Sequence, residues 1–408
     1  MPLASDVAQT RCCVVGGGPA GVILAICLAR RGVDVTLLEA HRDFDRAFRG
    51  DTLHPSTLEL LDQLGWADDV LAIPHGRMTE VAFDVGDQTF SVVDLSVLKT
   101  RFPYVAILPQ AKLLQFLVER GTAAFPKLVV RMQAKVDEFI RVQGQVVGVR
   151  YNSPDGHQEL RADLVVAADG RFSSLRKRAG IEPIRTSTPM DVLWFRLSAK
   201  EGDPHEMHFR IDAGHLLVIV NRDDYWQLGL VIAKGSYHDL KQGGLEQMRE
   251  LVAKLAPQFA DRVHELAQWS DITPLVVEAS RVPRWHQPGL LLIGDAAHVM
   301  SPVGGVGINV AIQDAVVAAN LLAKPLLEGR LTEKNLMAVQ RSRAWSVWLI
   351  QRLQSALHKR IVRGAIDPLK PFRPPWILRL PGVRKLAARL IAFGPVRVRI
   401  QGEKTPFV

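Results

Sequence analysis

Short apolar runs and longer helical patterns alternate in two parts of the chain. Largely apolar helical patterns run up to Gly32 and from Ile308 to Leu322. Four runs stop at a glycine or an acidic residue, as buried strands of a parallel sheet do: residues 11–15, 33–38, 163–168 and 290–293. This alternation predicts an α/β domain built on a parallel sheet.

The pattern changes between about residues 185 and 281, where longer strands predominate. One helical pattern lies near residues 245–255, and residues 77–107 alternate weakly, as strands do. The longer strands are expected at residues 191–197, 205–211, 215–221, 226–234 and 272–282. Together they predict an α+β unit with a mainly antiparallel sheet, inserted between the two halves of the first domain.

The chain therefore divides into three units. The first domain is discontinuous and is expected over residues 1–76, 108–184 and 283–330. The inserted domain is expected over residues 77–107 and 185–282, and a helical C-terminal segment over residues 331–408. In the last unit, apolar residues recur at helical spacing between Val383 and Ile391, with Arg384, Lys385 and Arg389 among them. Such a segment either packs on the first domain or makes a weak contact with an anionic membrane surface.

Composition places the chain among soluble globular proteins. At 408 residues, with 48% hydrophobic and 23% charged residues, it is long enough for two domains. It has no 18-residue apolar run and no basic-then-apolar amino terminus, so a cytoplasmic protein is expected. From Arg341 onward, 15 lysines and arginines face two acids, so this tail carries +13 and the first 340 residues carry −4 of the formal +9. The basic character belongs to the tail, and no nucleic-acid partner is expected.

Cysteine and histidine spacing excludes some other classes of site. Cys12 and Cys13 adjoin in a predicted strand, and Cys27 lies in the following helix. An odd, clustered set of three is not a disulfide framework, so these thiols are expected to act as small apolar side chains. The twelve histidines form no HExxH motif and no zinc-type pairing with cysteine, so no metal is expected.

A glycine-rich turn follows the first strand. The turn leads into an apolar helix, and the next strand ends at the acid Glu39. This is the GxGxxG nucleotide fingerprint in its usual context, in which the backbone approaches a pyrophosphate and the acid accepts hydrogen bonds from a ribose. The fingerprint leaves open whether the nucleotide is NAD or FAD. The residues concerned are Gly16, Gly18, Pro19, Ala20, Gly21 and Glu39.

Two more predicted strands end in a carboxylate beside a glycine, at Asp169 and at Asp295. Both carboxylates are expected at the carboxyl edge of the sheet, where open α/β sheets bind ligands. After Asp295 comes a proline- and glycine-rich stretch that ends where a helix opens at Ile308 and Asn309. The unpaired amides and partial positive charge of that helix end are suited to an anionic oxygen.

The order Gly294, Asp295, Pro302, Gly305, Gly307, Asn309 after a buried strand resembles the C-terminal flavin motif of the FAD-dependent monooxygenases of the para-hydroxybenzoate hydroxylase type, often called group A. The Asp169 turn resembles the family's middle motif, so all three motifs occur in order between residues 14 and 314. The resemblance implies a Rossmann-like FAD-binding domain with an inserted α+β substrate domain. It also implies that Asp295 holds an FAD hydroxyl and that the amides of Gly307, Ile308 and Asn309 face the flavin's pyrimidine edge.

Further contacts are expected in the loops between these motifs. Arg49, basic and beside a glycine, either reaches a phosphate or is an ordinary surface arginine. The resemblance places Gln110 against FAD and Asp51 and His54 near the ring; Ala40 and Val136 complete the expected cofactor contacts. His54 is a candidate general base or substrate contact, with a capping or core histidine as the alternative. Candidate residues lining a cavity under the inserted sheet are Trp194, Arg196, His208, Arg210 and Trp226, of which Arg196 is expected to orient the substrate.

The resemblance implies a monooxygenase in which NADPH or NADH transiently reduces FAD. Reduced flavin and dioxygen then form a C4a-hydroperoxide that hydroxylates an aromatic or phenol-like substrate. Only one nucleotide fingerprint is present, so the nicotinamide donor is expected to have no domain of its own. The alternatives are a flavin reductase or dehydrogenase without oxygen insertion and a nucleotide-binding module without catalysis. The WxWxIP signature of flavin-dependent halogenases is absent. A monomer or homodimer is expected.

Overall fold

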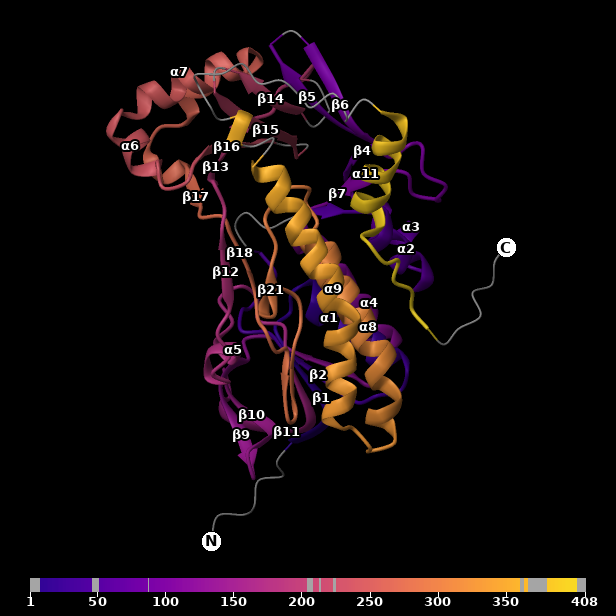
Figure 1. The fold of residues 1–408 in the computed structure, drawn as a ribbon. Helices are drawn as coiled ribbons and strands as arrows, with labels where there is room; N and C mark the ends of the chain where they lie inside the picture. Colours follow the sequence, from indigo (N-terminus) through magenta and orange to yellow (C-terminus); the bar gives the residue numbers. More distant parts are fainter. Residues whose placement is uncertain are drawn as a thin grey trace.

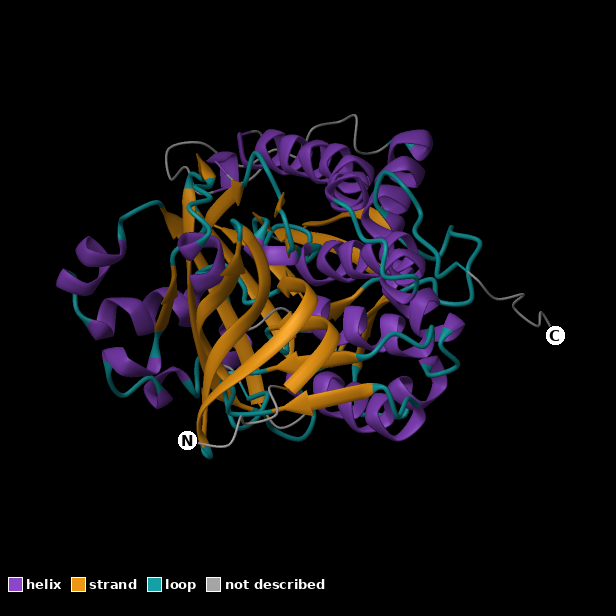
Figure 2. Ribbon diagram, turned by 90° about the horizontal axis from the view of Figure 1, so that it is seen from below, coloured by secondary structure: helices purple, strands orange, loops and turns teal. Residues whose placement is uncertain are grey.

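The computed structural model describes residues 8–45, 51–86, 88–203, 208–212, 214–222, 225–359, 363–365 and 380–401. The first of two layers in the fold is a mixed sheet of eight strands (Figures 1 and 2). Five parallel strands form its centre, in the spatial order β20 (Leu290–Leu292), β11 (Gly156–Ala167), β1 (Ala8–Val15), β2 (Val35–Leu38) and β8 (Leu128–Arg131). The short strand β19 (His286–Gln287) lies antiparallel at one edge, and β10 (Gln145–Ser153) and β9 (Lys135–Val142) extend from β11 as an antiparallel hairpin.

Helices pack on this sheet through their apolar residues, and the one at the centre is apolar on nearly every side. In α1 (Pro19–Arg30), all the residues from Ala20 to Ala29 are buried. Next to it lie α4 (Gln110–Ala124) and α8 (Gly307–Leu327), with α9 (Glu333–Leu357) packed outside α8 (Figure 1). Within the described chain, α8 alone is long and apolar enough to span a membrane, and 72% of that stretch is buried, as in a core helix.

The three cysteines belong to this core. Cys12 and Cys13 in β1 and Cys27 in α1 are buried and unpaired. Burial raises the pKa of the Cys27 thiol to about 12, so it stays protonated at neutral pH. The expectation that these thiols act as small apolar side chains is confirmed.

The second layer is a seven-stranded, largely antiparallel sheet at the other end of the molecule (Figure 1). Its strands lie in the order β17 (Thr273–Leu275), β13 (Met190–Ser198), β16 (Tyr225–Ala233), β15 (His215–Asn221), β14 (His208–Asp212), β5 (Glu80–Val85) and β6 (Gln88–Asp94). One face is covered by α6 (Tyr237–Gln242) and α7 (Leu245–Leu255). The α/β sheet with an antiparallel α+β unit inserted between its halves is the fold expected from the sequence.

The single strand expected over residues 272–282 is wrong. The structure has two strands there, β17 in the seven-stranded sheet and β18 (Glu278–Arg281), which pairs with β12 (Ile184–Ser187) and β21 (His298–Val299) in a separate sheet. The break lies at Val277, whose N–H donates to Asp191 and whose carbonyl accepts from Thr188 and Lys234. Side chains take the hydrogen bonds that a continuous strand would have used.

The small sheet β3 (Thr52–Leu53), β7 (Val105–Ile107) and β4 (Gly76–Met78) connects the two layers. Against β6 packs α11 (Pro381–Phe393), the amphipathic helix expected near the C-terminus. Its residues Ala388, Ala392 and Phe393 form a cluster with Val93 and Leu95. Because protein covers this face, the structure gives α11 a role in packing the C-terminal segment onto the rest of the chain.

Candidate functional site

The glycine turn between β1 and α1 is closed by contacts that only glycine permits. Gly16 has φ +108°, and a Cβ there would lie 2.4 Å from the Ala168 carbonyl oxygen. A Cβ on Gly21 would lie 1.9 Å from the Gly16 carbonyl oxygen. The first glycine motif therefore packs directly on the residue before Asp169, and the first two predicted motifs meet.

The amino end of α1 is open. Gly18 is its N-cap, no side chain caps the helix, and a Cβ on Gly18 would meet no heavy atom within 4 Å. The first helical residue is Pro19, followed by Ala20 with its unpaired amide. Free amides facing open space, at the positive end of a helix, fit a pyrophosphate group.

Glu39 ends β2 beside this turn. Its Oε2 accepts a hydrogen bond from the Gly17 amide (2.7 Å), and its Oε1 accepts one from the His41 amide (2.9 Å). The Glu39 carbonyl accepts from the Ala134 amide, which places β9 and the buried Val136 at the same edge as the exposed Ala40. The acid, the glycine turn and β9 are thus brought together as the sequence predicts.

Asp169 lies at the end of β11, but its carboxylate is used locally. Its Oδ1 accepts from the Ser173 hydroxyl (2.5 Å), and its Oδ2 accepts from the Leu175 amide (3.1 Å). These bonds begin α5 (Ser174–Arg178), whose first amides have no partner within the helix. The part of Asp169 that faces the nucleotide fingerprint is its backbone, since its Cα would lie 2.9 Å from a Cβ on Gly16.

The third motif meets the first. Gly294 and Asp295 form a single 3-10 turn after β20, and Asp295 is partly buried. Gly294 has φ +57°, and a Cβ there would lie 3.2 Å from both Ala20 in α1 and Ala311 in α8. All three turns that the sequence singled out therefore converge at the carboxyl edge of the parallel sheet.

The amino end of α8 is held by Asn309. Its Oδ1 accepts from the His54 amide (2.8 Å) and the Thr57 hydroxyl (2.7 Å), and its Nδ2 donates to the carbonyls of Thr52 (3.0 Å) and Gly305 (3.2 Å). The Asn309 side chain is fully engaged, so the groups available to a ligand here are the backbone amides of Gly307, Ile308 and Asn309, on a helix end with no side-chain cap. Pro302 is exposed at the start of the preceding loop.

An ion pair connects this region to the seven-stranded sheet. Arg222, in the turn between β15 and β16, lies with its Nη2 2.6 Å from Asp51 Oδ2, and the two side chains are 8% and 15% exposed. Asp51 Oδ1 also accepts from the amide of Gln110, the first residue of α4. Burial raises the pKa of the Asp51 carboxyl, although Arg222 opposes the shift. Arg49 lies outside the described residues.

His54 has the surroundings of a core histidine. It is buried, and its Nδ1 donates to the Ile391 carbonyl of α11 (2.7 Å). Burial lowers the pKa of the ring to about 4. The ring is neutral near pH 7 and is tied to the C-terminal helix, so the geometry fits the core alternative better than a general base.

Acid should destabilise the protein through His54. The unfolded chain takes up this proton near pH 6.5 and the folded chain only near pH 4, so stability present above pH 6.5 is lost as the pH falls through that window. By pH 5 the expected loss is about 2 kcal/mol. Urea unfolding at pH 7.5 and 5 measures it, with His54→Gln as the reference. Equal losses in both proteins would contradict the prediction.

The free face of the seven-stranded sheet is apolar and aromatic. The indole of Trp194 lies against the opposite residue, Gly229, where a Cβ would come within 2.7 Å of it. The rings of Phe83 and Phe209 lie 5.3 Å apart in the same cluster, against which Val303 of the loop before α8 packs. The Trp194 face of the sheet is therefore directed toward the third motif, which contains Asp295.

Strand alternation sorts the other candidate lining residues. Arg196 is exposed, on the same face as Trp194, with its guanidinium 4.6 Å from the centre of the Tyr225 ring. Trp226 is on the opposite face, buried against Phe259 and α7, so its expected place in the cavity is wrong. Arg210, opposite Leu217, shares the face of Trp226, and the side chain of His208 lies outside the part of the chain that the structure describes.

A set of polar residues on the inner face of α9 was not anticipated. They hold the chain around the third motif. The glutamines bond to backbone atoms, the arginine bonds to Asp314, and the histidine, which directly follows α9, bonds to the Ser301 hydroxyl. The signal was present as polar residues at helical spacing within a long amphipathic pattern. They are Gln340, Arg343, Gln351, Gln354 and His358.

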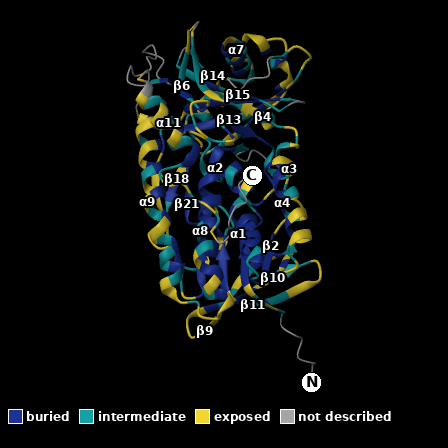
Figure 3. Ribbon diagram, turned by 90° about the vertical axis from the view of Figure 1, so that its right-hand side faces the viewer, coloured by how far each residue is buried: buried dark blue, intermediate teal, exposed yellow. Residues whose placement is uncertain are grey.

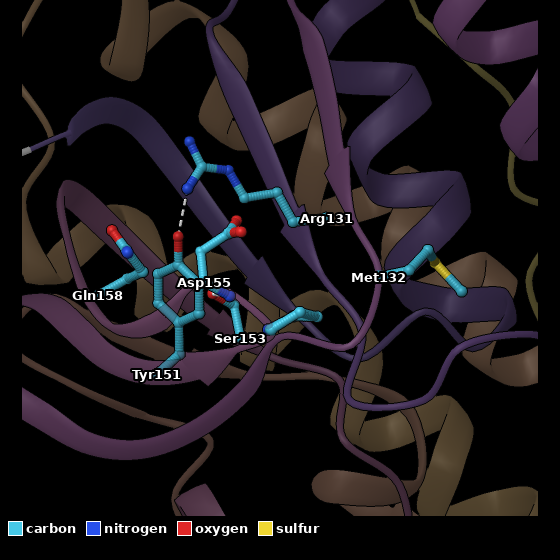
Figure 4. Close-up of a pocket in the computed structure, with 7 residues that line it drawn as sticks. Arg131, Met132, Tyr151, Ser153, Asp155 and Gln158 are labelled. Carbon is cyan, nitrogen blue, oxygen red and sulfur yellow. Dashed lines mark hydrogen bonds between the residues drawn. The ribbon is translucent and has the colours of Figure 1, made fainter.

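A separate groove of about 450 Å³ lies between β8 and the β10–β11 hairpin (Figure 4). There the Arg131 guanidinium donates to the Tyr151 hydroxyl. The groove contains no residue predicted to bind the nucleotide. Its lining is Arg131, Met132, Tyr151, Ser153, Pro154, Asp155 and Gln158.

Comparison with known proteins agrees with this geometry. Residues 9–352 match the FAD binding domain family. The chain is 35% identical to 6-methylpretetramide 4-monooxygenase of Streptomyces rimosus, over 98% of this chain and 96% of that protein. The solved fold of the anhydrotetracycline hydroxylase OxyS from Streptomyces rimosus matches with a TM-score of 0.76 at 23% identity, covering 97% of this chain and 78% of OxyS.

The fold is also similar to that of p-nitrophenol 4-monooxygenase PnpA from Pseudomonas putida DLL-E4, with a TM-score of 0.73 at 20% identity and 94% of each chain covered. The family match covers most of the chain and identifies FAD as the cofactor. The three converging turns are where the sequence placed that family's flavin motifs. The chain belongs to the FAD-dependent monooxygenases of the para-hydroxybenzoate hydroxylase type.

Proposed function

We propose that this monooxygenase uses NAD(P)H and dioxygen to hydroxylate an extended aromatic, phenol-like compound of the aromatic polyketide kind. The observation that carries the proposal is the aromatic and apolar face that includes Trp194 beside Gly229 and against which the loop that leads into α8 packs. The relative of 35% identity is named for 6-methylpretetramide, which supports a substrate of this class.

In this proposal the three turns hold FAD. The backbone from Gly16 to Gly18 and the amino end of α1 approach the pyrophosphate, while Gly21 lets α1 pack closely on this turn. Glu39 accepts hydrogen bonds from the ribose. Asp295 holds a hydroxyl between the two ends of the cofactor. Ala40, Gln110, Val136 and Arg49 remain predicted contacts.

The amino end of α8 receives the flavin's pyrimidine edge. The amides of Gly307, Ile308 and Asn309 and the positive end of the helix stabilise negative charge there, which favours reduction. Bound FAD supplies the redox chemistry: it accepts two electrons from NAD(P)H and uses them to activate dioxygen. The protein contributes binding, orientation and the exclusion of water.

The substrate lies between FAD and the seven-stranded sheet. Trp194 offers a planar surface on which an aromatic ring system stacks, and the apolar neighbours keep water away. Arg196, at the exposed end of the same face, orients an acidic phenol through its charge. His54 is not needed as a base in this scheme, because its nitrogen Nδ1 is engaged with α11.

The test is oxygen consumption coupled to nicotinamide oxidation. We expect polycyclic phenols to accelerate NADPH or NADH oxidation by the purified, FAD-loaded protein. One molecule of dioxygen should be consumed per nicotinamide oxidised, and the product should be heavier by one oxygen atom. Mass spectrometry with labelled dioxygen identifies the source of that atom. Equal rates with and without oxygen, and a reduced or desaturated product, would instead establish the reductase alternative.

A further inference from the structure

Asp314 lies in α8 at the point where four segments of the chain meet. Its carboxylate is fully buried. Its Oδ2 accepts from the Gly294 amide (3.2 Å) and lies 2.5 Å from His298 Nε2, while its Oδ1 accepts from Arg343 Nε of α9 (2.7 Å). One side chain therefore connects the turn of the third motif, β21, α8 and α9.

The group is a charged pair in a dry environment. Burial opposes ionisation of Asp314, but His298 and Arg343 outweigh it, and the pKa of the carboxyl lies below its usual value. Arg343 is 1% exposed, and its Nη2 donates to Gln313 (3.1 Å). Removing Arg343 leaves the buried carboxylate with His298 as its remaining side-chain partner, and removing Asp314 leaves the buried Arg343 guanidinium without a carboxylate.

The pair lies close to both parts of the third motif that are proposed to contact FAD, namely Asp295 and the amino end of α8. Gly294 immediately precedes Asp295, so the bond from its amide fixes the turn that carries that carboxylate. Asp314 lies seven residues along α8 from Gly307, a rise of about 10 Å. At that distance in a protein interior, a unit charge changes the stability of another charge appreciably.

We propose that Asp314 and Arg343 are positioning residues that hold the Gly294–Asp295 turn against α8 and set the electrostatic potential at the bound FAD. The inference rests on the proposed FAD site and adds a regulation of that site by a buried charge pair. A network that only stabilises the fold would lower the melting temperature without moving the redox potential of FAD in a charge-dependent way.

Four proteins test this: the wild type, Asp314→Asn, Arg343→Met and the double variant. Asp314→Asn leaves the Arg343 cation unbalanced, which stabilises the anionic reduced flavin, so the midpoint potential shifts to more positive values. Arg343→Met leaves the Asp314 carboxylate without the arginine cation, so the midpoint potential shifts to more negative values. The double variant returns close to the wild type. Asp314→Asn also binds FAD about tenfold more weakly, because the Gly294 amide then meets a neutral amide oxygen instead of a carboxylate, whereas Arg343→Met keeps that carboxylate.

Two further variants separate charge from folding. Arg343→Lys keeps the cation, so its potential stays near the wild-type value even if its melting temperature falls. Arg262→Met breaks a buried pair of the same kind, with Asp203, on the far face of the seven-stranded sheet, and lowers the melting temperature without moving the potential. If Asp314→Asn does not fold, the comparison of Arg343→Lys with Arg343→Met decides.

The inference would be overturned if the midpoint potential shifted in the same direction in both single variants, or if it shifted in neither of them. The pair would then be a purely structural feature. Wild-type protein that binds no FAD would overturn the cofactor assignment itself. The readouts are dye-equilibrated reduction of the bound flavin and fluorescence titration of the apoprotein, neither of which needs a substrate.

Discussion

Replacing Gly21 with alanine is expected to abolish FAD binding. The new Cβ would lie 1.9 Å from the Gly16 carbonyl oxygen, and that oxygen is not free to move. Gly16 has φ +108°, packs on the Ala168 carbonyl and donates its N–H to Leu38. The amino end of α1 must therefore shift away from β1. We expect FAD affinity to fall at least about a hundredfold, measured by fluorescence titration.

Two other glycines provide the matched comparison. Gly18→Ala adds a methyl group where no protein atom lies within 4 Å, so the apoprotein should melt at the wild-type temperature. Its methyl group would enter the space proposed for the pyrophosphate, and FAD affinity should still fall. Gly382→Ala, in α11 with open space around it, should change neither property. Wild-type affinity in Gly21→Ala would refute the proposed site.

The second large effect is expected from Arg222→Met, which should lower the free energy of unfolding by about 3–5 kcal/mol. The substitution leaves the Asp51 carboxylate buried without its cation. The double variant Asp51→Asn, Arg222→Met should recover most of the loss, because no charge then remains buried. Urea unfolding of the four proteins at pH 7.5 measures the coupling.

The pH dependence gives this prediction a second check. Burial already raises the pKa of Asp51 above its unfolded value, and loss of Arg222 raises it further. Stability linked to such a group is greatest below the unfolded pKa and is lost as the pH rises through the folded pKa. The deficit of Arg222→Met should therefore shrink as the pH is lowered toward 5.

An exposed ion pair serves as the control. Arg11 pairs with Asp163, and both side chains are almost half exposed. Arg11→Met should therefore change the free energy of unfolding by less than about 1 kcal/mol. A similar loss in Arg222→Met and Arg11→Met would mean that burial of the Asp51 pair has no special effect.

Local patterns predicted the elements that carry the site. The strand expected at residues 215–221 and the helix expected at residues 245–255 coincide with β15 and α7. The parallel sheet and its turns were also predictable, because buried strands that end at Gly16 and Gly294 need only short stretches of sequence to be recognised.

Other features were outside the reach of such patterns. Alternation separates the two faces of a strand, but it does not say which face Trp194 or Trp226 occupies until the helices are packed. The apolar positions of α11 favoured packing on the protein but left a membrane surface as an alternative, and the structure places them on β6. The break at Val277 depends on Asp191, which lies far away in the sequence.

By itself, the sequence determined where glycines, strand ends and helix starts occur, because backbone conformation is decided by neighbours along the chain. Only the tertiary structure decided which partner each buried polar group takes. Asp169 caps α5, Asn309 holds the loop around Thr52, His54 bonds to α11, and Asp314 pairs with Arg343. A polar side chain removed from water must bond to whatever the folded chain brings within about 3 Å, and that neighbour is chosen by packing over long distances in sequence.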